Sequence, residues 1–199
     1  RRFPGAVWSL SIGWACDKFV NATDLIPVQA ALTKAQEHGT TAFDATGDNA
    51  GLECKGADEW SSPPGPDDVG LDAISSLPTM TAVGATTLSV GPRGQWLGEY
   101  AWFDSPLSQG TSGGVSTLFA RPTWQEKLAA GRDTAQRRLS PDVAAVGDPF
   151  TGVRFIFAQN EYVGAGTSQA APIWAALAGK EHGLDRKSTR LNSSHVSLS

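Results

Sequence analysis

The sequence predicts an α/β fold, in which a mostly parallel sheet has helices packed on it. Two observations favour this class. First, strand-like runs at residues 7–12 and 41–45 lie on either side of residues 25–37, whose apolar side chains recur at helical spacing. A strand–helix–strand unit of this kind favours parallel pairing of its strands. Second, 22 glycines and 12 prolines are typical of a loop-rich α/β protein and not of a helical bundle.

The other elements follow in order along the chain. Asp24 is the expected N-cap of the first helix, and Gly39 is expected to end it. Residues 56–66 are interpreted as a surface loop, and residues 91–94, Gly-Pro-Arg-Gly, as the turn of a hairpin. Further predicted elements are a strand at residues 80–83, a helix at residues 125–131 and an Ala-rich helix after Ser168.

Size and charge exclude several classes of protein. A chain of 199 residues has the length of one domain, and its 40% of hydrophobic residues is enough for a core. The net charge of −4, without a basic stripe, argues against a nucleic-acid partner. No apolar run reaches the length of a membrane span, so no membrane partner is expected either.

The two ends of the chain differ from the rest. Residues 185–199 lose the apolar periodicity and look like translated adaptor sequence, of the kind found at the ends of sequencing contigs; a natural polar tail is the alternative. We leave them out of the fold prediction. Because a strand begins almost at once, at residue 7, we expect the chain to start inside a domain.

Ser168 is the first candidate catalytic residue. The motif Gly166-Thr167-Ser168 brings a serine to the start of an apolar helix, with its hydroxyl exposed and unpaired backbone N–H groups beside it. These N–H groups and the helix dipole can hold a negative oxygen. The motif therefore indicates a serine nucleophile, although a serine or threonine at this place is more often a helix N-cap.

Further blocks stand in a fixed order with this motif, at residues 7–14, 41–51, 81–88, 111–125 and 141–152. Together they resemble the sedolisin family, the serine-carboxyl peptidases, over residues 6–179. The resemblance implies a subtilisin-like sheet with flanking helices. Residues 1–184 would form an incomplete peptidase domain and residues 185–199 a non-native-looking tail. It also implies an endopeptidase or tripeptidyl-peptidase that hydrolyses peptide bonds through Ser168.

Asp48 is the second catalytic candidate. It follows a strand, where an isolated aspartate commonly forms an Asx-turn. In the family, however, an aspartate in Gly-Asp-Ser-Gly stands in the oxyanion hole. Asp48 matches it, whereas Asn49 replaces the serine that follows. An ionised carboxylate would repel an oxyanion, so the aspartate must be protonated. The resemblance thus implies an enzyme that acts in acid.

Two segments match the family's substrate-binding motifs. Ser11 and Gly13 match the Ser-Trp-Gly strand end, with Ile12 in place of tryptophan, and the backbone of this strand is expected to pair with an extended substrate. Ser112, Gly113 and Gly114 match a Gly-Gly-Gly segment of the family, with serine in place of its first glycine. This segment is expected to line the other side of the cleft; a simple glycine turn is the alternative.

Cys16 and Cys54 each follow the carboxyl end of a strand in the same strand–helix–strand unit. Adjacent strands lie about 4.8 Å apart and a disulfide needs Cα atoms within about 7 Å, so a bridge is sterically reasonable. Two buried free thiols are the alternative. The resemblance favours the bridge, because secreted bacterial relatives carry a similar pair. It thereby implies an oxidising, extracellular location.

A serine nucleophile also needs a base. His38 is expected to close a helix and interact with its dipole, and the remaining histidines are His182 and His195. In the family the base is a glutamate, oriented by an aspartate four residues later and placed upstream of the Ser11 strand. Here only Glu181 has such an aspartate, Asp185, and the doubtful tail begins there. We therefore expect the chain to be inactive by itself.

The resemblance also covers cofactors and partners. No cofactor or metal is expected in this chain, and the calcium site of the full-length family member is expected downstream of the serine helix. A peptide or protein substrate and a pro-domain of its own are the implied partners. Two alternatives stay open. One is a subtilisin-type protease that uses histidine, against which Asp48 argues; the other is a non-catalytic peptide-binding relative.

Overall fold

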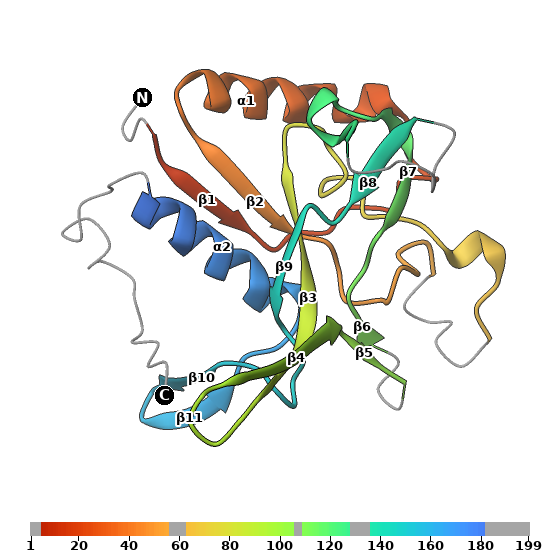
Figure 1. Ribbon diagram of the computed structural model, residues 1–199. Coiled ribbons are helices and arrows are strands. Elements are labelled where there is room, and N and C mark those ends of the chain that lie inside the picture. The colour runs from red at the N-terminus through yellow and green to blue at the C-terminus, as the bar shows by residue number, and fades with distance from the viewer. Residues whose placement is uncertain (1–4, 56–62, 106–108, 128–135, 182–199) are drawn as a thin grey trace.

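The computed structural model describes residues 5–55, 63–105, 109–127 and 136–181. At its centre lies a five-stranded sheet in which β3 pairs with β2, β4 and β9, and β2 pairs with β1. All of these pairs are parallel except β3–β4. The strands are β1 (Val7–Leu10), β2 (Thr41–Ala45), β3 (Thr81–Val90), β4 (Trp96–Ala101) and β9 (Val143–Val146). The α/β prediction is therefore confirmed (Figure 1).

Helices α1 (Ile26–Glu37) and α2 (Thr167–Glu181) cover opposite faces of this sheet (Figure 1). Successive side chains of a strand point to opposite faces. On β2, Ala42 accordingly belongs to the apolar cluster on the α1 side, whereas Phe43 belongs to the cluster that contains Ala170 and Ala171 of α2. The result is three layers, with the carboxyl ends of the parallel strands meeting near the start of α2.

The predicted boundaries of the first helix were half right. Gly39 ends α1 as expected, with φ +78° and its N–H donated to the carbonyl of Gln36. Asp24 is not the N-cap, however, because a 3₁₀ turn, η1 (Ala22–Leu25), precedes α1. Asp24 lies inside that turn, where its carboxylate accepts the N–H of Asn21 at 2.9 Å.

Other elements also begin or end at residues that differ from the predicted ones. β1 ends at Leu10, two residues early, and β3 extends far beyond residues 80–83. The hairpin is confirmed, since the N–H of Gly91 is donated to Gln95 between β3 and β4. Where the helix predicted at 125–131 would begin there is a 3₁₀ turn, η4 (Thr123–Gln125), and residues 128–135, with the rest of that prediction, lie outside the described part. The same holds for residues 56–62 of the predicted loop, which is followed by η3 (Pro66–Asp68), and for the tail at 185–199.

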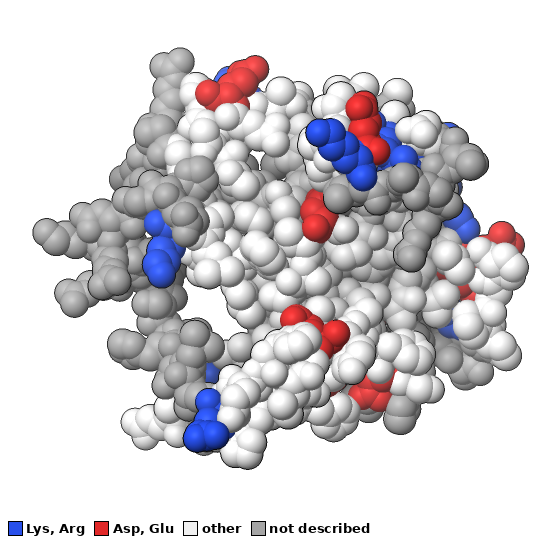
Figure 2. Space-filling model, in the orientation of Figure 1, with Lys and Arg blue, Asp and Glu red and all other residues white. Residues whose placement is uncertain are grey.

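Three short antiparallel pairs had no prediction at all. They are β5 (Phe103–Asp104) with β6 (Gln109–Gly110), β7 (Gly114–Ala120) with β8 (Arg137–Ser140), and β10 (Arg154–Phe157) with β11 (Asn160–Val163). Acidic and basic side chains are scattered over the face in Figure 2, in keeping with the lack of a basic stripe. No helix in the described ranges is long and apolar enough to cross a membrane.

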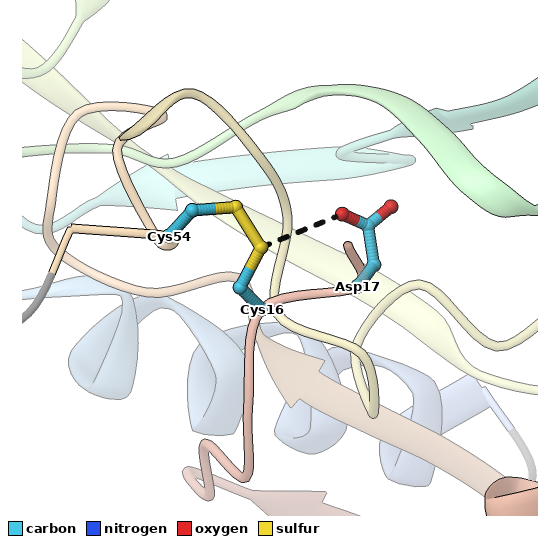
Figure 3. Close-up of side chains that lie close together, drawn as sticks. All are labelled: Cys16, Asp17 and Cys54. Atoms are coloured by element: carbon cyan, nitrogen blue, oxygen red, sulfur yellow. Dashed lines mark hydrogen bonds between the residues drawn. A yellow bond between two sulfur atoms is a disulfide. The ribbon is translucent and has the colours of Figure 1, made fainter. Parts of the chain in front are cut away.

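Cys16 and Cys54 form the expected disulfide, with their Cα atoms 4.8 Å apart (Figure 3). Both cysteines are buried, and Asp17 lies beside the bridge. The bridge ties the segment after β1 to the loop after β2. Both segments contribute residues to the candidate site, so the bridge fixes these two parts of it to each other.

Loss of this bridge should destabilise the protein substantially. The disulfide closes a span of 38 residues, which corresponds to about 3–4 kcal/mol of unfolding free energy in the chain-entropy model. We expect urea unfolding of the Cys16→Ser, Cys54→Ser double variant to show a loss of this order. On reduction, the protein should gain the mass of two hydrogen atoms. Two alkylatable thiols in the unreduced protein would contradict the assignment.

Candidate active site

Ser168 lies in the first turn of α2 with its side chain exposed. The residue before the helix, Gly166, has a left-handed φ of +81°, and a Cβ there would collide with the carboxylate of Asp48. Only glycine meets both conditions. The glycine of the Gly-Thr-Ser motif is therefore required by the structure, because the carboxylate of Asp48 packs against this turn directly before the helix that carries Ser168.

Asp48 is fixed to the start of α2 by hydrogen bonds. Its Oδ1 accepts the backbone N–H and the hydroxyl of Thr167, both at 2.8 Å. The N–H of Gly47 is donated to the same threonine hydroxyl at 3.1 Å. Residues 119 positions apart in the chain are thereby joined. The structure brings the two predicted catalytic residues, Asp48 and Ser168, to one place.

Both residues line a cavity of about 140 Å³. Ser11, Ile12 and Gly13 form another part of its wall, as expected for the segment that matches the substrate strand. The Ser11 hydroxyl lies 3.5 Å from the carbonyl oxygen of Ser168, to which it is donated. The predicted nucleophile and the predicted substrate strand are therefore in direct contact.

Ser112, Gly113 and Gly114 are not among the described residues that line this cavity. Ser112 is fully buried one layer behind it, where its hydroxyl accepts the N–H of Gly51 at 3.1 Å and is donated to Glu53. Gly114 is the first residue of β7. The expected role of this segment in lining a cleft stays a prediction.

Glu53 lines the cavity, although nothing in the sequence analysis singled it out. Its carboxylate accepts the backbone N–H of Asn49 at 3.2 Å and the side-chain amide at 3.1 Å, besides the hydroxyl of Ser112. Burial raises the pKa of Glu53. The signal that could have found it is its place directly before Cys54, which the predicted bridge carries to the carboxyl edge of the sheet.

Two more carboxyl groups accompany the site. Asp72 lines the cavity, and Asp44 is fully buried on β2. Burial raises the pKa of both groups. For Asp44, the hydrogen bond from Ile12 opposes the shift and the charge of Asp72 adds to it, so the pKa reaches about 7. A charged residue in the middle of an apolar strand is the sequence signal for Asp44.

Asp44 should make the protein less stable as the pH rises. Because its folded-state pKa of about 7 lies above the ordinary value of 3.8, the folded state binds this proton more tightly, and stability is lost as the pH climbs from about 4 to 7. The full shift corresponds to about 4 kcal/mol. Urea unfolding at pH 4, 6 and 8 should show this decline. Asp44→Asn, which resembles the protonated acid, should flatten it; an unchanged slope would disprove the assignment, and Asp24→Asn is the control.

Among the described residues, no imidazole or carboxylate is hydrogen-bonded to the Ser168 hydroxyl. His38 is the C-cap residue of α1, as expected, and does not line the cavity. His182, His195 and Asp185 lie outside the described part, as does the side chain of Glu181.

One group of potential metal ligands occurs in the described residues, formed by Cys16, Asp17 and Cys54. Its two sulfur atoms are joined in the disulfide, so only one carboxylate is left as a donor (Figure 3). Calcium requires six to eight oxygen ligands. This cluster therefore does not fit the calcium that the family resemblance implies, and the segment downstream of α2 lies outside the described residues.

Comparison with known proteins finds relatives that share sequence and fold with this chain. No protein-family model matches the chain. Kumamolisin from Bacillus sp. (strain MN-32) is 37% identical over 111 residues, which is 54% of this chain. Sedolisin from Pseudomonas sp. (strain 101) is 30% identical over 179 residues, or 86% of this chain. The structure of Pseudomonas sedolisin, a serine-carboxyl proteinase complexed with two molecules of pseudo-iodotyrostatin, superposes with a TM-score of 0.73 over 88% of the chain at 30% identity.

The matches cover only part of each relative. The chain spans 20% of kumamolisin, 29% of sedolisin and 48% of the solved sedolisin chain. Within the matched part, this chain has a mostly parallel sheet, and Asp48 is bonded to the start of α2 beside Ser168. The chain belongs to the sedolisin family, and its fold is the subtilisin-like α/β fold of that family.

Proposed function

We propose that the chain is part of an acid-acting serine-carboxyl peptidase, an endopeptidase or a tripeptidyl-peptidase, in which Ser168 is the nucleophile and Asp48 stabilises the oxyanion. The observation that carries this proposal is the single cavity that holds both side chains at the start of α2. The serine attacks the peptide carbonyl, and the negative oxygen that forms needs donors aimed at it.

Asp48 can supply one of these donors. Its Oδ1 already accepts two hydrogen bonds from Thr167, so Oδ2 is the oxygen that would carry a proton and donate it to the oxyanion. A second donor is the N–H of Ser168, which has no acceptor among the described residues because it lies in the first turn of the helix. Two donors beside an exposed nucleophile form an oxyanion hole.

The other carboxyl groups support an acid optimum. Asp44, Glu53 and Asp72 all have raised pKa values because they are buried in or beside the cavity. At low pH they are neutral; as the pH rises they ionise and place negative charge near the developing oxyanion. That charge disfavours the transition state. Activity should therefore decline with rising pH.

The base is expected from outside this chain, as the family's glutamate oriented by an aspartate on one helix face. This proposal is supported by the described residues, none of which offers an imidazole or carboxylate hydrogen-bonded to the Ser168 hydroxyl. A secreted, oxidising location is proposed on the strength of the buried disulfide between Cys16 and Cys54, since such bridges persist outside the reducing cytosol.

Two proteins test the proposal together. The chain of 199 residues alone should not hydrolyse peptides from pH 3 to 8, because an unassisted serine hydroxyl is a poor nucleophile. A chimaera, in which residues 6–179 replace the matching stretch of Pseudomonas sedolisin, should hydrolyse them in acid. Circular dichroism and urea unfolding establish that each protein is folded.

The outcomes separate the alternatives. Ser168-dependent turnover by the chain alone at neutral pH would favour a histidine-type protease and contradict the proposal. A folded chimaera that binds peptides without cleaving them would favour the non-catalytic relative. Acid turnover by the chimaera alone is the result that supports a serine-carboxyl peptidase.

A further inference from the structure

The segment that follows β1 is held in an unusual way. β1 ends at Leu10, and residues 11–14 continue past it without a strand partner, although they form part of the cavity wall. Their side chains are exposed. A strand edge of this kind can accept an extended peptide, but only if something other than a neighbouring strand keeps it straight.

Two aspartates perform this task from the protein interior. Asp44 Oδ1 accepts the N–H of Ile12 at 3.4 Å, and Asp72 Oδ2 accepts the N–H of Trp14 at 2.8 Å. Asp44 belongs to β2, where it is paired with Leu10, the last residue of β1. Its side chain takes over as acceptor at the point where the backbone pairing ends.

Asp72 is itself firmly placed. Its Oδ1 accepts the N–H groups of Ile74 and Ser75 at 2.9 and 3.0 Å, so its other oxygen points at Trp14 from a fixed position. A second tie lies close by, since Ala73 donates its N–H to the carbonyl of Ala15 at 2.8 Å. These bonds fix the Trp14 end of the segment, as the bond from Ile12 to Asp44 fixes the end next to β1.

The pattern of these hydrogen bonds leaves the backbone of Gly13 available to a substrate. In extended backbone, the polar groups of alternate residues point to the same side. Ile12 and Trp14 turn their N–H groups inward to the aspartates, so the polar groups of Gly13 between them are directed outward. Gly13 lines the cavity, and no described residue accepts its N–H.

We propose that Asp44 and Asp72 are positioning residues that act as a carboxyl clamp on residues 11–14, so that Gly13 presents its backbone to an extended peptide. This inference rests on the proposed function, because it gives the clamp a substrate. Asp44 is fully buried and its Oδ2 has no hydrogen-bond partner in the described part of the chain. Burying a carboxyl group with an unpaired oxygen costs folding free energy. The other oxygen of Asp44 accepts the N–H of Ile12 at a point that no backbone acceptor reaches.

Hydrogen exchange on the chain itself tests the clamp without any activity. The amides of Ile12 and Trp14 should be protected and that of Gly13 should exchange freely, in nuclear magnetic resonance spectra of the 199-residue protein. Asp44→Ala should speed exchange at Ile12 about tenfold, the loss expected for one hydrogen bond, and Asp44→Asn, which keeps an acceptor, should restore protection. Protection at Gly13 with fast exchange at Ile12 in the unmodified protein would overturn the clamp even if a variant does not fold.

Kinetics of the chimaera test the positioning role. Asp44→Ala should raise KM for peptides about tenfold and leave kcat within about twofold, since one oriented backbone hydrogen bond is lost. Asp44→Asn should restore KM. Asp24→Ala, which removes a surface carboxylate that also accepts a backbone N–H, is the matched control and should leave KM unchanged. An unchanged KM in an active Asp44→Ala chimaera overturns the inference. If the amides of Ile12 and Trp14 are protected in the chain, but the chimaera is folded and inactive, only the proposed function is overturned.

Discussion

Ser168→Ala is expected to remove peptide hydrolysis by the sedolisin chimaera, lowering kcat by at least about 10⁴-fold. The reason is that nucleophile, base and orienting group act as one unit, so the loss of one member costs nearly as much as the loss of all. The change should leave the fold intact, because the side chain is exposed and no other residue depends on its hydroxyl in the described structure. Initial rates in acid, with peptide binding measured separately, provide the test.

The matched control for this variant is Ser89→Ala. Ser89 is an exposed serine at the far end of β3, away from the cavity, so its removal should leave kcat unchanged. Retention of most activity in a folded Ser168→Ala chimaera would show that another group is the nucleophile. The helix N-cap interpretation of this serine would then be the correct one.

Local motifs explain why part of the site could be predicted. The conformation of Gly166 and the start of α2 are set by adjacent residues, so the position of Ser168 could be inferred from the sequence. Asp48 follows a strand, where an isolated aspartate commonly forms an Asx-turn, and it is singled out because it matches the family's Gly-Asp-Ser-Gly motif. Cys16 and Cys54 follow strand ends of that same unit, and their bridge needs no contact with a distant element.

Contacts between distant residues could not be predicted. Asp72 reaches the cavity through a loop between β2 and β3, and its contact with the site is seen only in the structure, where Trp14 donates to it. The Ser112 hydroxyl is likewise bonded to Gly51 and Glu53, a long-range pairing that its own motif does not encode.

The same reason accounts for the errors in the fold. Strands β10 and β11 pair only with each other, and their side chains are largely exposed, so they lack the alternating pattern by which a half-buried strand is recognised. The end of β1 at Leu10 reflects tertiary structure as well. Asp44 replaces the backbone acceptor from this point on, and Ile12 therefore continues the extended path outside the sheet.

Asp48→Ala is expected to lower kcat of the chimaera by about 10²–10³-fold, with a smaller effect on peptide binding, because an oxyanion donor acts mainly in the transition state. Asp48→Asn tests whether a neutral donor at this position is sufficient. Asparagine keeps an oxygen for the two bonds from Thr167 and offers an N–H donor at the place of Oδ2. It should therefore retain more activity than alanine.

The measurement is kcat from pH 3 to 8 for the unmodified chimaera and both variants, with unfolding free energies to confirm that each is folded. Asp67→Ala, in the exposed turn η3, is the control for removal of a negative charge and should change neither kcat nor its pH profile. If Asp48→Ala and Asp48→Asn lose activity equally, neither the bonds from Thr167 nor a neutral donor at this position supports the reaction, and the assignment of Asp48 as an oxyanion donor is contradicted. If neither loses activity, the donor must come from the N–H of Ser168 alone, and the acid optimum must then arise from Asp44, Glu53 and Asp72, whose raised pKa values place charge beside the cavity as the pH rises.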